Sequence, residues 1–127
     1  MPDKVTFEYA IIRVVPKVER EEFFNVGVLL FSKRKKFLGI KFKIDTNKLH
    51  AFSDEIELDD IENYLKAWEL VCQGEPSGGA IGKLELSDRF RWLAASKSTI
   101  IQCSKTHPGL CVDPKETLKD LFESFVL

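Results

Sequence analysis

Three arginines, one glutamate and one asparagine are the residues of this sequence best suited to binding a charged ligand. They are Arg13, Arg20, Glu22, Asn25 and Arg89. A guanidinium group binds phosphate or carboxylate through paired hydrogen bonds, and Glu or Asn side chains can fix its orientation. The set predicts an anion or acidic-peptide site if folding gathers it at one end of a sheet. The alternative is structural, with Arg13 and Glu22 as an ion pair and Asn25 shaping a strand.

Three cysteines and a histidine carry the side chains that could bind a metal or act as nucleophiles: Cys72, Cys103, His107 and Cys111. Structural zinc sites use closely spaced ligand pairs, and this spacing does not match them. A Cys103–His107 nucleophile pair would need an activated thiolate, which nothing in the pattern indicates. The odd number of cysteines and the lack of C-x-x-C predict reduced thiols. We expect no metal and no cofactor.

A glycine-rich segment at residues 74–82 precedes Lys83 and invites comparison with a phosphate-binding loop. Ser77 stands where that motif has its first glycine, and Leu84 replaces the Ser or Thr that would hold magnesium. The segment also follows a predicted helix rather than a strand. We expect a long mobile loop, because four glycines and a proline leave few side chains to pack.

Four consecutive basic residues at 33–36, followed by Lys41 and Lys43, could form a basic ridge that binds nucleic acid weakly or an acidic protein. The alternative is that they keep a strand edge soluble and unpaired. Nineteen Lys and Arg against twenty Asp and Glu give a net charge of -1. This balance removes any global attraction to nucleic acid or to an anionic membrane.

The chain has 127 residues, of which 44% are hydrophobic and 31% charged. These values are typical of one folded domain in water, and we expect a single domain over residues 1–127. No apolar run approaches the roughly 20 residues needed to cross a bilayer, and the N-terminus lacks the pattern of a signal peptide. Together with reduced thiols, these features predict a cytoplasmic protein without a membrane partner.

Apolar alternation and β-branched residues predict four strands, at residues 6–15, 25–32, 37–44 and 98–104. Both faces of the first strand are apolar, so we expect it to be central. The basic segment at 33–36 predicts a hairpin that makes the second and third strands antiparallel. In the third strand apolar residues alternate with glycine and lysine, which indicates one buried face and one face in water.

Helical patterns fill most of the remaining chain. A short helix is expected at residues 45–52, and a longer one at 59–74 with its first residue as N-cap and its last as a left-handed C-cap. Residues 87–95 suit a helix or a strand, and we favour a short helix. A turn at 106–109 precedes a C-terminal helix at 113–125, which starts with an Asp N-cap and Pro and seals the core.

The elements follow the order strand, strand, strand, helix, helix, strand, helix (βββααβα). Hairpin-linked strands followed by helices are typical of the α+β class. We therefore predict a mostly antiparallel sheet of about four strands, with helices packed on one face.

Two stretches resemble a known bacterial family, the domain of unknown function 3037 (DUF3037). Residues 9–16 and 19–30, with the sequences YAIIRVVP and EREEFFNVGVLL, resemble its opening. Its later block is matched by RFRWL, STIIQ and HPG at residues 89–93, 98–102 and 107–109. The resemblance covers nearly the whole chain and implies a bacterial single-domain protein.

The resemblance implies no chemistry, but it draws attention to Ser98 and His107 beside the five residues named first. It also implies, through gene neighbourhood, an accessory role beside a HipA-like kinase. We therefore expect a non-catalytic interaction module. The alternatives are an enzyme that handles phosphates or nucleotides with Arg13, Arg20, Glu22, Arg89 and His107, and a weak nucleic-acid binder that uses residues 33–43.

Overall fold

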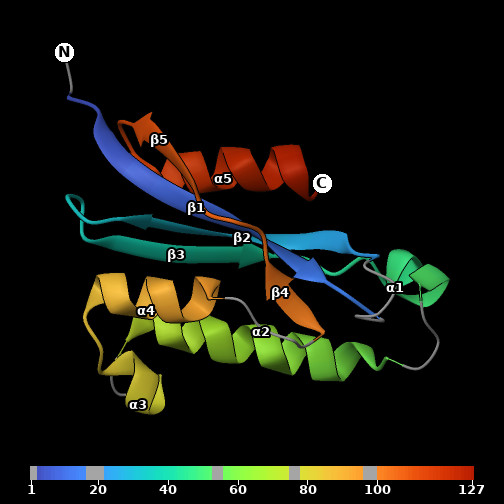
Figure 1. Cartoon of the computed structure of the whole chain (residues 1–127). Helices are drawn as coiled ribbons and strands as arrows, with labels where there is room; N and C mark the ends of the chain where they lie inside the picture. The colour runs from blue at the N-terminus through green and yellow to red at the C-terminus, as the bar shows by residue number, and fades with distance from the viewer. Residues whose placement is uncertain (1–2, 17–21, 53–55, 75–77, 96–99) are drawn as a thin grey trace.

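The computed structural model describes residues 3–16, 22–52, 56–74, 78–95 and 100–127. The elements along the chain are β1 (Val5–Val14), β2 (Phe24–Ser32), β3 (Phe37–Phe42), α1 (Thr46–Phe52), α2 (Leu58–Gln73), α3 (Gly79–Gly82), α4 (Leu86–Ala94), β4 (Ile101–Cys103), β5 (His107–Cys111) and α5 (Pro114–Phe125) (Figure 1). The α+β class with an antiparallel sheet is confirmed. No helix within the described residues has the length and apolar character to cross a membrane.

The sheet has five strands, and β1 is central as predicted. Its strand order is β3-β2-β1-β4, and β5 also pairs with β1. One edge of β1 pairs with β2, whereas its other edge pairs with β5 near the start and with β4 near the end. The predicted hairpin joins β2 to β3 through residues 33–36.

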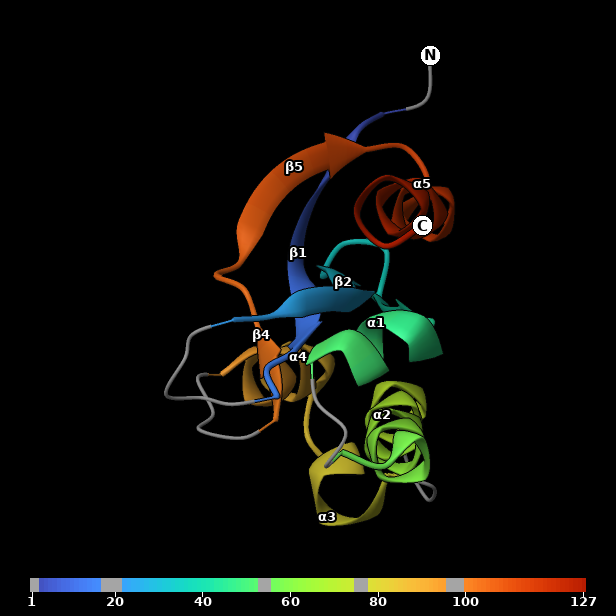
Figure 2. The same ribbon diagram turned by 90° about the vertical axis from the view of Figure 1, so that its right-hand side faces the viewer.

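Helices cover both faces of the sheet, which differs from the expected single face. Figure 1 and Figure 2 show α5 on one side and α2 and α4 on the other. In β2, Leu29 and Phe31 belong to the larger core beneath α2 and α4, whereas Val28 and Leu30 belong to the smaller core beneath α5. Both alternating sets are apolar, so a single helical layer would have left one of them in water.

The expectation that one face of β3 lies in water is therefore wrong, because helices cover both faces of the sheet. α5 packs over Gly39, where a Cβ atom would lie 2.6 Å from Phe37 Cζ and 2.9 Å from Leu118 Cδ2. Lys41 remains exposed on β3. The glycine that suggested a solvent face in the sequence instead allows a close approach to α5.

Side-chain caps begin α1 and α5. Asp45 Oδ1 accepts the backbone N–H groups of Asn47 and Lys48 at the start of α1, and Asp113 caps α5 in the same way, as predicted. Among the described residues, α2, α3 and α4 begin without a side-chain cap, and the N-cap of α2 is Glu57 rather than the predicted Asp59. α2 ends as expected at Gly74, where φ is 89°.

Two segments rich in turn-forming residues have regular structure that the sequence did not predict. The expected loop at 74–82 contains α3, and the expected turn at 106–109 contains the start of β5. Pro108 is tolerated because β5 lies at a sheet edge, where a missing N–H costs little. Gly109 is required there because a Cβ atom would lie 2.5 Å from Phe7 Cζ. The helix favoured at 87–95 is confirmed as α4.

Candidate functional site

Two of the predicted site residues, Arg13 and Asn25, are neighbours at the end of the sheet. They are cross-strand partners, and the β1–β2 register shifts at this point because of a bulge in β2. Gly27 avoids a side-chain clash with β3 at this point, since a Cβ atom there would lie 2.6 Å from the Lys41 carbonyl oxygen. The Arg13 guanidinium lies over the Phe23 ring, 4.1 Å from its centroid. The structure therefore brings part of the predicted set together.

The polar groups of this pair are only partly satisfied. Asn25 Nδ2 donates to the Phe125 carbonyl oxygen of α5 at 3.1 Å. Arg13 Nε and Asn25 Oδ1 are buried and have no hydrogen-bond partner among the residues that the structure describes. Glu22 is exposed just before β2. Arg20 and Ser98 lie outside the described residues, so their assignment to a site stays a prediction.

Arg89 lies away from this pair and clamps two helices together. Its Nε donates to the Leu84 carbonyl oxygen at 3.1 Å, and its Nη1 donates to those of Val71 and Cys72, both at 2.9 Å. The last carbonyl groups of a helix lack partners within it, so Arg89 supplies donors that α2 needs. α4 packs on the larger core, whereas alternation along β1 places Arg13 on the face covered by α5. Arg13 and Arg89 consequently do not share the predicted cleft.

His107 and the cysteines do not form a reactive pair. The exposed His107 ring packs on Tyr9 with its centroid 5.3 Å away, on the α5 side of the sheet. Cys103 packs on the larger core and donates its thiol to the Leu93 carbonyl oxygen at 3.6 Å. Burial raises the pKa of Cys72 to about 12, so its thiol is protonated and unreactive at neutral pH. Among the described residues, no group of His, Cys, Asp and Glu side chains is arranged to hold a metal ion.

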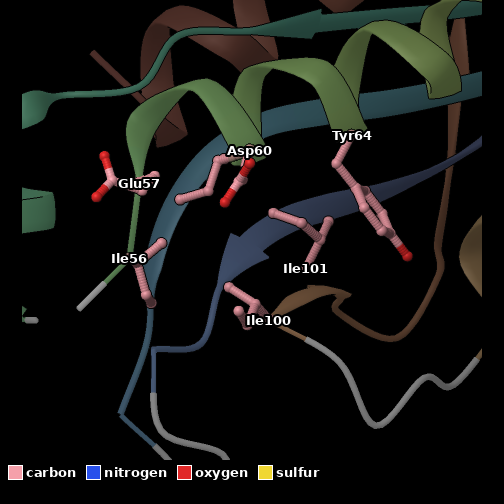
Figure 3. A pocket seen from close by; sticks show the side chains of 7 residues that line it. Ile56, Glu57, Asp60, Tyr64, Ile100 and Ile101 are labelled. Atoms are coloured by element: carbon pink, nitrogen blue, oxygen red, sulfur yellow. The ribbon is translucent and has the colours of Figure 1, made fainter.

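An apolar groove opens between the N-terminal half of α2 and the start of β4 (Figure 3). Its volume is about 370 Å³. We call it the isoleucine groove, and it is lined by Ile56, Glu57, Asp60, Ile61, Tyr64, Ile100 and Ile101. Ile100 is 41% exposed and Tyr64 is 37% exposed. Apolar side chains left in water at one place are typical of a surface that another molecule covers.

Two carboxylates give the isoleucine groove a negative rim. Glu57, the N-cap of α2, and Asp60, in its first turn, are both exposed and lie beside the apolar floor. Sequence reasoning missed this site because its residues come from distant segments and have ordinary types. The one available signal was Tyr64, an aromatic residue that lies outside the apolar stripe of α2.

A second concave surface carries positive charge and lies near the β2–β3 hairpin. We call it the lysine cleft, and its charged lining residues are Lys33, Lys36, Lys83, Glu85 and Arg89. The basic residues at 33–43 are therefore divided rather than joined in one ridge. Lys43 lines a different cavity together with Asn25, and Arg34 and Lys35 line a third.

Comparison with known proteins identifies a family and nothing finer. A family model described as "Protein of unknown function (DUF3037)" matches residues 9–126, nearly the whole chain. No curated protein and no solved structure matches the chain.

Proposed function

The chain belongs to the DUF3037 family of proteins of unknown function, and from this premise we propose that it is a non-catalytic interaction module that binds a protein partner through the isoleucine groove. The observation that carries the proposal is the exposed apolar floor bounded by two carboxylates. Burying an aliphatic side chain in such a groove contributes about 1.5–3 kcal/mol to binding before the costs of association.

The positions of the candidate catalytic residues also favour an interaction role. An enzyme that used Arg13, Arg89 and His107 together would need them around one substrate. Arg89 is bound to backbone carbonyls on the α2 and α4 side, and His107 packs on Tyr9 on the α5 side. This separation favours an interaction role over a phosphate-handling reaction that uses all three residues at one site.

The chemistry of the groove defines the partner segment. Its apolar floor accepts one or two aliphatic side chains, and its rim carboxylates, Glu57 and Asp60, attract positive charge. The segment should therefore carry Leu, Ile or Met next to Lys or Arg. A HipA-like kinase, which the family resemblance implies, is one candidate to test for such a segment.

Replacing Ile100 by Ser should weaken peptide binding about tenfold or more while leaving the fold intact. Ile100 is 41% exposed, so its loss removes contact with the partner rather than with the core. The probe is the peptide most enriched from a random phage-displayed library selected on the unaltered protein. Binding is measured by fluorescence anisotropy, and folding by the melting temperature.

Leu110→Ser is the matched control, because Leu110 is 63% exposed on β5 and lies outside the groove. It should leave peptide affinity unchanged. The proposal fails if the library yields no binding peptide, if Ile100→Ser binds as tightly as the unaltered protein, or if Leu110→Ser weakens binding equally.

A further inference from the structure

The lysine cleft has the features of a second, separate binding site. We propose that it binds a phosphorylated small molecule that also carries an apolar or aromatic part. The inference rests on different residues from the isoleucine groove and goes beyond the interaction role. It is supported by one observation: basic residues from separate segments line the same cavity, whose volume is about 560 Å³.

Three segments supply the positive charge. Lys33 and Lys36 come from the β2–β3 hairpin, Lys83 from the turn after α3, and Arg89 from α4. Figure 1 labels β2, β3, α3 and α4. None of the three lysines forms an ion pair with a described residue. The lining includes four cationic residues and one carboxylate, that of Glu85, so the cleft has an excess of three positive charges. An anion bound there would relieve their mutual repulsion.

Arg89 gives the lining of the cleft a cation whose position is fixed. Three carbonyl oxygens accept from its Nε and Nη1, while Nη2 has no hydrogen-bond partner among the described residues. Gly74 leaves room for the group, since a Cβ atom there would lie 3.1 Å from Nη1. A guanidinium held in this way loses little conformational entropy when it donates to a phosphate oxygen.

The remaining lining indicates what else the ligand carries. Phe31, Leu84 and Leu86 supply apolar surface beside the charged groups. The volume is within the range of small-molecule pockets and exceeds what one phosphate group needs. A nucleoside diphosphate has the required combination of charge and an aromatic ring, so ADP is a suitable probe.

Isothermal titration at fixed ionic strength should detect binding of ADP, weaker binding of pyrophosphate and none of adenosine. The double variant Lys33→Ala/Lys83→Ala should weaken ADP binding about tenfold, since two exposed charges are removed. Glu85→Gln should strengthen it severalfold because it removes a repulsive carboxylate. Lys36 is left unchanged because its φ is 52°, where substitution would also alter the backbone.

The control is Lys105→Ala/Lys115→Ala, which removes two exposed lysines elsewhere and should not change ADP affinity. Absence of ADP binding, equal losses in the two double variants, or weaker binding in Glu85→Gln would each overturn the proposal. The proposal would also be overturned if ADP does not bind but a single-stranded oligonucleotide does, and if its binding requires Lys33 and Lys83. That result would point to nucleic acid as the ligand.

Discussion

Phe90→Ala is expected to lower the free energy of unfolding by about 3–5 kcal/mol, the largest effect of any substitution considered for this protein. Phe90 is 0% exposed and stacks on Phe31, with ring centroids 5.2 Å apart. It attaches α4 to the sheet through the larger core. Truncation would remove this contact and leave a cavity that the rigid sheet cannot close.

Urea denaturation, followed by circular dichroism, measures this loss. Trp92→Ala is the matched control, because Trp92 is on the same helix and is 40% exposed. Its loss should be clearly smaller. A Phe90→Ala variant that unfolds at the same urea concentration as Trp92→Ala would contradict the position of α4 on the sheet.

Arg89→Leu is expected to cost about 2–4 kcal/mol of stability, because it removes charge-assisted hydrogen bonds to three carbonyl groups. Two of these carbonyls belong to Val71 and Cys72 at the end of α2, and the third belongs to Leu84. Leucine keeps part of the apolar stem, so the change acts mainly on the hydrogen bonds. The effect should be largest where α2 ends.

Hydrogen exchange locates the effect, since the amide of Gly74 donates to carbonyls of the last turn of α2 and should exchange faster in Arg89→Leu. Arg91→Leu is the control on the same helix. Arg91 forms an exposed ion pair with Glu8, at 2.6 Å, which should contribute less than about 1 kcal/mol. Equal destabilisation by the two variants would show that Arg89 is not the clamp described above.

The sequence predicted the elements whose periodicity extends over many residues. β1, the β2–β3 hairpin, α2 and α5 were recognisable from their apolar spacing, and in α5 the Asp113 cap agrees with it. α3 and β5 were missed because Gly and Pro usually indicate turns. In β5, Pro108 is tolerated by the sheet edge and Gly109 is required by the ring of Phe7. Both reasons are tertiary, and neither can be seen in a local pattern.

The candidate site was less predictable than the fold. The sequence predicted that Arg13 and Asn25 belong to one site without pairing them, and the structure places them as cross-strand neighbours. Arg89 was expected beside them, but its guanidinium donates to backbone carbonyls of α2. Because these partners are backbone groups, no pattern of side-chain types could predict them. The isoleucine groove and the lysine cleft depend on how distant segments meet. Side-chain types alone therefore could not predict either one.

Reversing one charge on the rim of the isoleucine groove tests the proposed interaction most directly. Asp60→Lys should weaken binding of the selected basic peptide about tenfold. The variant should instead prefer an acidic version of that peptide, in which Glu replaces each Lys and Arg. Asp120→Lys, on the exposed side of α5, should change neither affinity. An anisotropy titration of the four combinations of protein and peptide should show this exchange of preference. The proposed interaction would be contradicted if Asp60→Lys and the unaltered protein bound the two peptides with the same relative affinity.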